Sequence, residues 1–281
     1  MRFFGFLLCV ALVGFYYATT PSMRAESITL APDPQNGEYI YFAAGCGGCH
    51  TAPNAKEDAK KTLSGGQTFP SPFGTFVAPN VSMHVDYGIG AWSQDDFVRA
   101  LRQGISPDGR HYYPAFPYTS YQGMSDQDVV DLWSYWQTLP SSEEKSQVHD
   151  LSVYAKWRRP LGIWKMMFQS APDPQMLDAE LARGEYLVNT LGHCGECHTA
   201  RNVFGARSSK NIFMGAQHPN GKGRIPAIAG DKFDWIAADI AEYLKSGFTP
   251  DYDVAGGLMA EVIENTSQLS DQDRMAIANY L

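Results

Sequence analysis

The chain has 281 residues, of which 44% are hydrophobic and 19% are charged, a composition typical of a globular protein and not of a disordered chain. Its formal net charge of −8 argues against nucleic acid as a partner and weakly favours a partner with a positively charged docking patch. The length is sufficient for two ordinary domains.

Residues 1–25 are predicted to be an export segment. Met1-Arg2 precedes an uncharged apolar stretch from Phe3 to Ala18, which is the pattern of a secretory signal. The stretch is shorter than the ~20 residues that span a bilayer, although residues 19–23 would extend it far enough. Because the best cleavage site, at residues 23–25, is weak, we expect an uncleaved anchor and keep a removed signal peptide as the alternative. The protein would then lie at the periplasmic face of the inner membrane, or in the periplasm if the segment is cleaved.

The sequence Cys-x-x-Cys-His occurs twice, at residues 46–50 and 194–198. It is the attachment signature of covalent c-type haem, in which two thiols bond to the haem and the His binds the iron. A zinc site or a thioredoxin-like dithiol can also use Cys-x-x-Cys, but neither explains the His that follows both copies. We therefore predict two covalently bound haem c groups. Their attachment residues would be Cys46, Cys49 and His50 for the first haem, and Cys194, Cys197 and His198 for the second.

The two motifs belong to an internal repeat. Gly-Glu-Tyr precedes both, at residues 37–39 and 184–186, and Ser-Asp-Gln-Asp recurs at residues 125–128 and 270–273. Six further residues between these segments match at an offset of 143. We interpret the chain as a duplicated domain, with a signal or anchor at 1–25, domain 1 at 26–140, a linker at 141–175 and domain 2 at 176–281.

Each repeat is predicted to be mainly α-helical. One helix is expected at about 34–44, capped by Asp33 or Asn36, and another begins after Ser93 and ends at Gly104. Ser125 with Asp128 resembles a capping box and starts a third helix, whose counterpart covers 270–281. The long Gly/Pro-rich segments at 64–79 and 215–230 are expected to be loops that wrap a flat cofactor.

The connecting segment at residues 154–168 mixes basic and aromatic side chains. Such a stretch can lie on a membrane surface. We favour the alternative, in which it is a linker that packs across both domains.

A six-coordinate haem needs a second axial ligand, and Met is the usual choice in small cytochromes. Met259 follows Gly256-Gly257 on a segment that we expect to be a loop before the last helix, where glycines let the backbone approach a haem. Its repeat equivalent in domain 1 is Phe116, which cannot bind iron. We favour Met124 as the ligand of the first haem. Met83, His84, His111 and an open sixth position remain alternatives.

The haem-binding histidines also need acceptors that fix the ring tautomer. Pro79 lies 29 residues after His50, and Pro226 lies 28 residues after His198. A proline carbonyl accepts without a competing N–H, so we predict these two carbonyls as the acceptors. We expect His149 to be a surface residue and His193 to be a loop residue beside a haem edge.

The chain resembles exported bacterial dihaem cytochromes c with two class I-like domains, and it is similar to the cytochrome subunits of membrane-bound alcohol and gluconate dehydrogenases. The resemblance covers nearly everything after residue 30. It rests on both Cys-x-x-Cys-His motifs and on residues 72–76, 79–81, 88–90 and 113–118. It implies a mainly α fold of two tandem class I cytochrome c domains with long haem-wrapping loops. Those dehydrogenase subunits commonly carry three haems and a Met in the place of Phe116, whereas this chain has two motifs.

Motifs and resemblance together lead us to expect an electron carrier without enzymatic activity of its own. The expected donor is a periplasmic dehydrogenase or a quinol-oxidising complex, and the expected acceptor is a terminal oxidase or a soluble cytochrome. The N-terminus would provide the contact with the membrane, and no nucleic acid is expected. The alternative is a dihaem enzyme of the peroxidase type with an open first haem, for which Phe116 is the only support.

Overall fold

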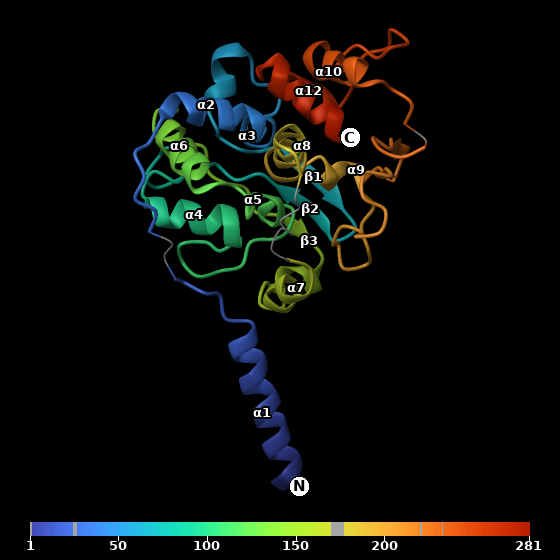
Figure 1. Ribbon diagram of the computed structural model, residues 1–281. Coiled ribbons are helices and arrows are strands. Elements are labelled where there is room, and N and C mark those ends of the chain that lie inside the picture. Colours follow the sequence, from blue (N-terminus) through green and yellow to red (C-terminus); the bar gives the residue numbers. More distant parts are fainter. Residues whose placement is uncertain (1, 25–26, 170–176, 220, 232) are drawn as a thin grey trace.

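The computed structural model describes residues 2–24, 27–169, 177–219, 221–231 and 233–281, and shows a mainly helical body from which one helix projects (Figure 1). The first repeat contains α2 to α6 with β1 and β2, and the second contains α8 to α12 with β4 and β5. The bounds are α1 Arg2–Ala18, α2 Pro34–Ala43, α3 Cys46–His50, η1 Glu57–Lys61, β1 Thr68–Ser71, β2 Gly74–Val77, α4 Gln94–Gln103, α5 Tyr118–Tyr121, α6 Asp126–Trp136, β3 Asp150–Leu151, η2 Val153–Lys156, α7 Leu161–Phe168, α8 Ala179–Glu185, η3 Tyr186–Leu191, α9 Gly195–His198, β4 Ala216–Gln217, β5 Arg224–Ile225, α10 Ala237–Ser246, α11 Leu258–Thr266 and α12 Asp271–Tyr280.

Helix α2 begins and ends where the sequence predicts. Asp33 is the N-cap, and its side chain accepts hydrogen bonds from the backbone N–H groups of Gln35 and Asn36. Asn36, the other cap candidate, lies inside the helix and donates to the buried carboxylate of Asp131 on α6 at 2.8 Å. This bond ties the first turn of α2 to α6, the helix against which α2 packs.

The caps of α4 and α6 differ in one detail. In α4, Ser93 and Asp96 form a complete capping box, because the Asp96 carboxylate also accepts from the Ser93 N–H at 3.0 Å. In α6, the Ser125 side chain accepts from the Asp128 N–H at 3.1 Å, as the sequence predicts. The Ser125 N–H, however, donates to the hydroxyl of Tyr186 from the other repeat.

The internal repeat is visible in the fold. The isolated β-bridge between Ile105 and His111 recurs 143 residues later between Phe248 and Val254. Each repeat also contains an antiparallel hairpin, β1–β2 in the first and β4–β5 in the second. These hairpins correct the expectation of unstructured loops at 64–79 and 215–230. Helix α11 was not predicted either.

One buried core spans both repeats. It contains Ile40 of α2, Leu132 of α6, Leu187 and Val188 of η3, and Ile277 of α12. Because side chains of both halves share this core, burial of apolar surface holds the two repeats together.

The connecting segment packs across both repeats. Strand β3 pairs with β2 and completes a three-stranded sheet of order β1-β2-β3. Further along, Trp164 of α7 contacts Tyr118 of the first repeat edge to face and donates from its indole N–H to the Phe204 carbonyl of the second at 2.9 Å.

Helix α1 leaves the body next to α7 (Figure 1), and most of its large apolar side chains are exposed. It has 17 residues, which at 1.5 Å per residue makes it about 26 Å long, less than the ~30 Å hydrocarbon core of a bilayer. Within the described ranges, no helix combines the length and the apolar character that a membrane crossing requires. The expected N-terminal anchor is therefore not supported.

The end of α1 is nevertheless built into the body. Thr19 has no exposed surface, and its carbonyl lies 3.0 Å from Nε2 of His111. The Arg159 guanidinium donates to the Thr19 hydroxyl, the Tyr16 carbonyl and the Thr20 hydroxyl at 2.9–3.0 Å, and stacks over the Tyr16 ring. We call this set of contacts the α1 socket.

Candidate functional site: two haem-attachment motifs

The first Cys-x-x-Cys-His motif forms the short helix α3. Gly45, with a φ of 61°, turns the chain out of α2 and into this helix, in a conformation that side chains disfavour. Nδ1 of His50 lies 3.1 Å from the Pro79 carbonyl oxygen. Since a carbonyl only accepts, the proton is on Nδ1 and Nε2 keeps a free lone pair.

The second motif repeats this geometry on α9. Nδ1 of His198 lies 2.9 Å from the Pro226 carbonyl oxygen. Both hydrogen bonds that the spacing predicts are thus present. Each leaves Nε2 as the free donor atom, which is the tautomer that a haem-binding His requires.

The four motif cysteines form no disulfide. In the part of the chain that the structure describes, no group of three His, Cys, Asp or Glu side chains could hold a metal ion.

A buried tyrosine next to the first motif has an unsatisfied hydroxyl. Tyr41 Oη is buried without a hydrogen-bond partner in the protein, and a Cβ on Gly47 would lie 2.7 Å from it. A buried polar atom without a partner is costly. The residues around the first motif therefore fit a bound group that brings its own polar substituents, as haem does with its propionates.

The two motifs lie side by side. A Cβ placed on Gly192, two residues before Cys194, would lie 3.9 Å from the carbonyl oxygen of Ala43, three residues before Cys46. Tyr121 of α5 lies between the motifs, donating to the Ala44 carbonyl at 3.1 Å and contacting the His193 ring edge to face at 5.5 Å. Tyr121 was not among the residues predicted from the sequence, because its repeat equivalent is not a tyrosine.

The two candidate Met ligands differ in their surroundings. Met124 is buried in the shared core, with 3% of its surface exposed, and Met259 packs at the border of that core with Cys46 and Cys194. Met259 lies in the first turn of α11 rather than on a loop, two residues after Gly257 with its φ of 58°. Phe116, its repeat equivalent, packs against Tyr112, Tyr118 and Tyr121.

The other candidate ligands of the first haem have different environments. His111 contacts Thr19 in the α1 socket. Nδ1 of His84 accepts from the backbone N–H groups of Asp86 and Tyr87, and its ring stacks on Tyr87. Met83 packs at the border of the shared core, as Met259 does. His149 is half-buried and accepts from the Val77 N–H at 3.1 Å, which corrects its assignment to the surface.

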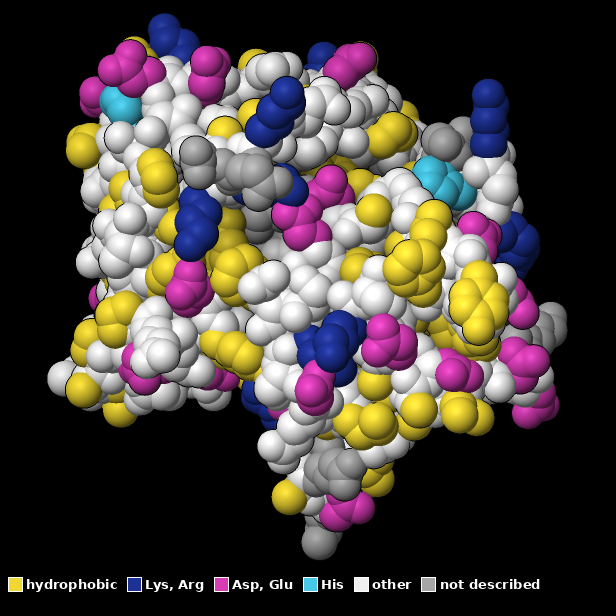
Figure 2. All heavy atoms as spheres, turned by 90° about the horizontal axis from the view of Figure 1, so that it is seen from above, with side chains coloured by type: hydrophobic (Ala, Val, Ile, Leu, Met, Phe, Trp, Pro, Cys, Tyr) yellow, Lys and Arg dark blue, Asp and Glu magenta, His cyan; other side chains and the backbone are white. Residues whose placement is uncertain are grey.

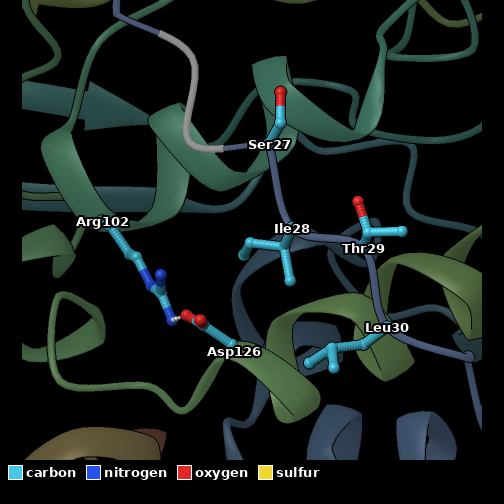
Figure 3. A pocket seen from close by; sticks show the side chains of 6 residues that line it. All are labelled: Ser27, Ile28, Thr29, Leu30, Arg102 and Asp126. Atoms are coloured by element: carbon cyan, nitrogen blue, oxygen red, sulfur yellow. Dashed lines mark hydrogen bonds and ion pairs between the residues drawn. The ribbon is translucent and has the colours of Figure 1, made fainter.

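A surface pocket lies behind Met124. It is lined by residues 27–30 together with Arg102 and Asp126, which point toward one another across it (Figure 3). Arg102 binds the Asp126 carboxylate and the Met124 carbonyl, at 2.7 and 2.6 Å. The ion pair recurs in the second repeat between Lys245 and Asp271. Because both repeats contain it, we assign the pair to the fixing of the segment before the last helix of each repeat, not to a ligand site.

Comparison with known proteins agrees with this geometry. A cytochrome c family model matches residues 34–140. A protein described as "Diheme cytochrome c-type" from Cereibacter sphaeroides is 51% identical over 257 residues, covering 90% of this chain and 86% of its own length. The chain belongs to the dihaem c-type cytochromes. It accordingly carries two covalently bound haem c groups.

The cytochrome is also similar to larger dehydrogenase subunits. It is 34% identical to the cytochrome c subunit of a quinone-dependent alcohol dehydrogenase from Gluconobacter oxydans, over 88% of this chain and 54% of that subunit. It is equally similar to the cytochrome c subunit of gluconate 2-dehydrogenase from Pantoea cypripedii, over 88% of this chain and 58% of that subunit. The cytochrome thus spans little more than half the length of these subunits.

Proposed function

We propose that the cytochrome transfers electrons through two adjacent haems, one in each repeat. The first haem is attached by Cys46 and Cys49 with His50 as its iron ligand. The second is attached by Cys194 and Cys197 with His198 as its ligand. The observation that carries the proposal is the pair of His–Pro hydrogen bonds in two motifs that lie side by side. Bound haem supplies one-electron redox chemistry at iron, while the protein positions, buries and ligates it.

Met259 and Met124 are proposed as the second axial ligands of the second and first haem. A thioether ligand raises the reduction potential of a haem. Burial of Met124 would also keep water away from the first iron. Arg102, by holding the Met124 carbonyl at 2.6 Å, would fix the backbone from which this side chain extends.

A dehydrogenase is the proposed electron donor, with a quinol-oxidising complex as the alternative donor. Support comes from the relatives that are cytochrome subunits of alcohol, gluconate and fructose dehydrogenases. The proposed acceptor is a terminal oxidase or a soluble cytochrome. On the face seen in Figure 2, acidic and basic side chains are interspersed with hydrophobic ones that reach the surface. A mixed surface of this kind suits a transient redox partner better than a strongly charged one.

Export and contact with a membrane are proposed for the N-terminal segment. The apolar side chains of α1 that extend into solvent include Phe3, Phe4 and Phe6, and an exposed apolar surface of this extent marks an interaction site. The α1 socket supports an uncleaved N-terminus, since Thr19 is fully buried in the body. The cytochrome would then lie at the periplasmic face of the inner membrane.

A peroxidase-type activity is not favoured. The relatives include the cytochrome c subunits of alcohol and gluconate dehydrogenases, and none of those compared is named as a peroxidase. The polar candidates for an acid or base near the first haem, His84 and His111, hydrogen-bond to a turn and to Thr19.

Optical spectra with and without carbon monoxide test the proposal on the complete holoprotein. Two low-spin, six-coordinate haems that bind carbon monoxide slowly are expected. Met259→Ala should open the second haem to carbon monoxide and Met124→Ala the first, whereas Met275→Ala, on the exposed face of α12, is the matched control. Rapid carbon monoxide binding to the unmodified protein would contradict the carrier role. An unchanged first-haem spectrum in Met124→Ala would remove Met124 as its ligand.

A further inference from the structure

Each repeat contributes one tyrosine that hydrogen-bonds to the other repeat. Tyr39 of α2 donates its hydroxyl hydrogen to the Asp273 carboxylate of α12 at 2.6 Å, and its oxygen accepts from the Ser270 N–H at 3.1 Å. Tyr186, the repeat equivalent of Tyr39, donates to the Asp128 carboxylate and accepts from the Ser125 N–H at 3.1 Å. Each tyrosine thus reaches the start of the last helix of the other repeat. We call these two sets of contacts the tyrosine clasps.

Each clasp completes a helix N-terminus that its own repeat leaves open. In α4, the carboxylate of Asp96 closes the capping box by accepting from the Ser93 N–H. At α6 and α12, the Ser N–H donates instead to a tyrosine oxygen from the other repeat. The hydroxyl of the same tyrosine donates a hydrogen bond to the Asp three residues after the Ser, which is Asp128 in α6 and Asp273 in α12. The Ser N–H therefore has the tyrosine as its partner only when the two repeats are docked.

The carboxylates that accept from the clasp tyrosines also accept from a second side chain, at equivalent positions of the two repeats. Asn36 donates to Asp128 in the first repeat at 3.2 Å, and Arg183, 147 residues later, donates to Asp273 in the second at 2.9 and 2.6 Å. Contacts in which residue i of one unit meets residue j of the other, and the reverse, define a twofold interface. The two repeats therefore pack about a pseudo-twofold axis.

The haem motifs lie within this interface. Glu261 and Asn265 of α11 approach Gly48 of the first motif, within 3.6 Å of a Cβ placed on that glycine. Tyr121 donates to the Ala44 carbonyl and contacts the His193 ring of the second repeat, and Lys60 forms an ion pair with Glu264. Any rotation of one repeat about the other would change the separation and the angle between the two motifs.

We infer that Tyr39 and Tyr186 are positioning residues for electron transfer between the haems, because the tyrosine clasps fix how the two haem domains face each other. The inference rests on the proposed function. It gives a structural basis for the rate of electron transfer between the two haems. Two tyrosine hydroxyl groups, which belong to neither haem-attachment motif, hold the domains in one mutual orientation. Loss of both hydroxyls would let the domains sample other orientations, in which the haems are less well coupled.

The test uses the full-length holoprotein and the variants Tyr39→Phe, Tyr186→Phe and their combination. Tyr135→Phe and Tyr280→Phe are matched controls. These two tyrosines are also repeat equivalents, but they bond within one repeat, to Glu38 at 3.0 Å and to Asn189 at 2.8 Å. Three readouts are compared: the optical spectrum of each haem, amide exchange at Ser125 and Ser270 in the reduced protein, and the rate of electron equilibration between the haems after pulsed reduction.

Each single variant should accelerate exchange of the Ser amide in the opposite repeat by about three- to tenfold, the factor that corresponds to losing a hydrogen bond to a neutral hydroxyl. The Ser93 amide serves as the internal reference. The double variant should keep both haem spectra and lose at least about half of the inter-haem rate, and both controls should retain the original rate.

Faster amide exchange without any change of the inter-haem rate in the double variant would overturn the inference and leave the clasps purely structural. If the double variant fails to take up haem, the single variants decide the matter through the same rate. An absence of electron equilibration in the unmodified protein would instead contradict the proposed function, so the two failures are distinguishable.

Discussion

Helix α8 crosses α12 so closely at Gly184 that a Cβ placed on this glycine would lie 2.2 Å from the carbonyl oxygen of Ala276. Gly37 has the same relationship to Asp131, at 2.0 Å. Both distances are far below a van der Waals contact, and the obstacle in each case is backbone, which cannot move aside as a side chain would. Each repeat therefore needs glycine where its first and last helices cross.

Gly184→Ala is expected to destabilise the protein by about 3 kcal/mol or more, at the upper end of the cost of overpacking. Gly14→Ala on the exposed helix α1 is the matched control, because a Cβ there meets nothing within 4 Å and the change should not destabilise the protein. Thermal unfolding followed by circular dichroism measures both. Equal midpoints for the two variants would show that the helices separate at little cost.

Much of this fold follows from the sequence, and the exceptions have physical reasons. The caps at Asp33, Ser93 and Ser125 are local signals, and they predict α2, α4 and α6 closely. The hairpins were missed because their strands are only two to four residues long, too short for an alternating pattern to develop. Helix α11 was missed because Gly256-Gly257 reads as a loop.

Part of the candidate site could also be predicted from the sequence, and part could not. Spacing to a proline predicted the His50 and His198 hydrogen bonds, because chain length limits where a backbone acceptor can lie. The interface between the motifs depends on contacts between residues more than 70 positions apart, as for Tyr121 and His193, and no local pattern encodes these. Tyr39 and Tyr186 were visible as matched residues of the repeat, yet nothing in the sequence indicates that they exchange partners.

Stability should depend on pH through the clasp at Asp273. Burial tends to raise the pKa of this carboxyl, but hydrogen bonds from Arg183 and Tyr39 and the charge of Arg183 outweigh it, so the pKa is lowered. A lowered folded-state pKa means that the stabilisation is complete above the unfolded value of about 4 and is lost as the pH falls through the folded value.

Burial and the Asp273 hydrogen bond raise the pKa of Tyr39, so its contribution is complete below about pH 10 and is lost as the pH rises through the folded value. Denaturant titrations at a series of pH values should therefore show a plateau with an acid and an alkaline limb. Asp273→Asn should flatten the acid limb and Tyr39→Phe the alkaline one. Limbs that are unchanged in both variants would assign them to other groups.

Asn80 is predicted to support the first haem selectively. Its buried side chain donates to the carbonyls of Ser142 and Glu144 at 2.9 and 2.6 Å and accepts from the Ser82 N–H at 2.9 Å. Asn80→Ala leaves these groups unpaired and should cost about 2–4 kcal/mol. It also loosens the neighbouring Pro79 carbonyl, which orients His50.

Potentiometric titration of Asn80→Ala should therefore show a shifted potential for the first haem and an unchanged potential for the second. Asn189→Ala in the second repeat removes a side chain that bonds to Tyr280 and provides the comparison. Equal shifts of both haems in Asn80→Ala would point to a general loss of structure.

Arg159 is expected to hold the N-terminal helix in its socket. Arg159→Gln removes most of the donors that reach Tyr16, Thr19 and Thr20, so limited proteolysis between residues 20 and 24 should accelerate by about tenfold, the factor that corresponds to about 1.4 kcal/mol. Lys156→Gln, at an exposed position nearby, is the control and should leave the rate unchanged. Equal cleavage of both variants would show that Thr19 stays buried without the arginine.

The exchanged tyrosines also determine how this protein can be dissected. If the chain is cut between the repeats and each half is produced alone, each half gains an exposed tyrosine hydroxyl and an open N–H at the start of its last helix. It also loses part of the shared core. Potentials and spectra recorded on separate halves would then describe domains with altered helix ends, and the properties of each haem are better obtained from the intact chain with one motif inactivated at a time.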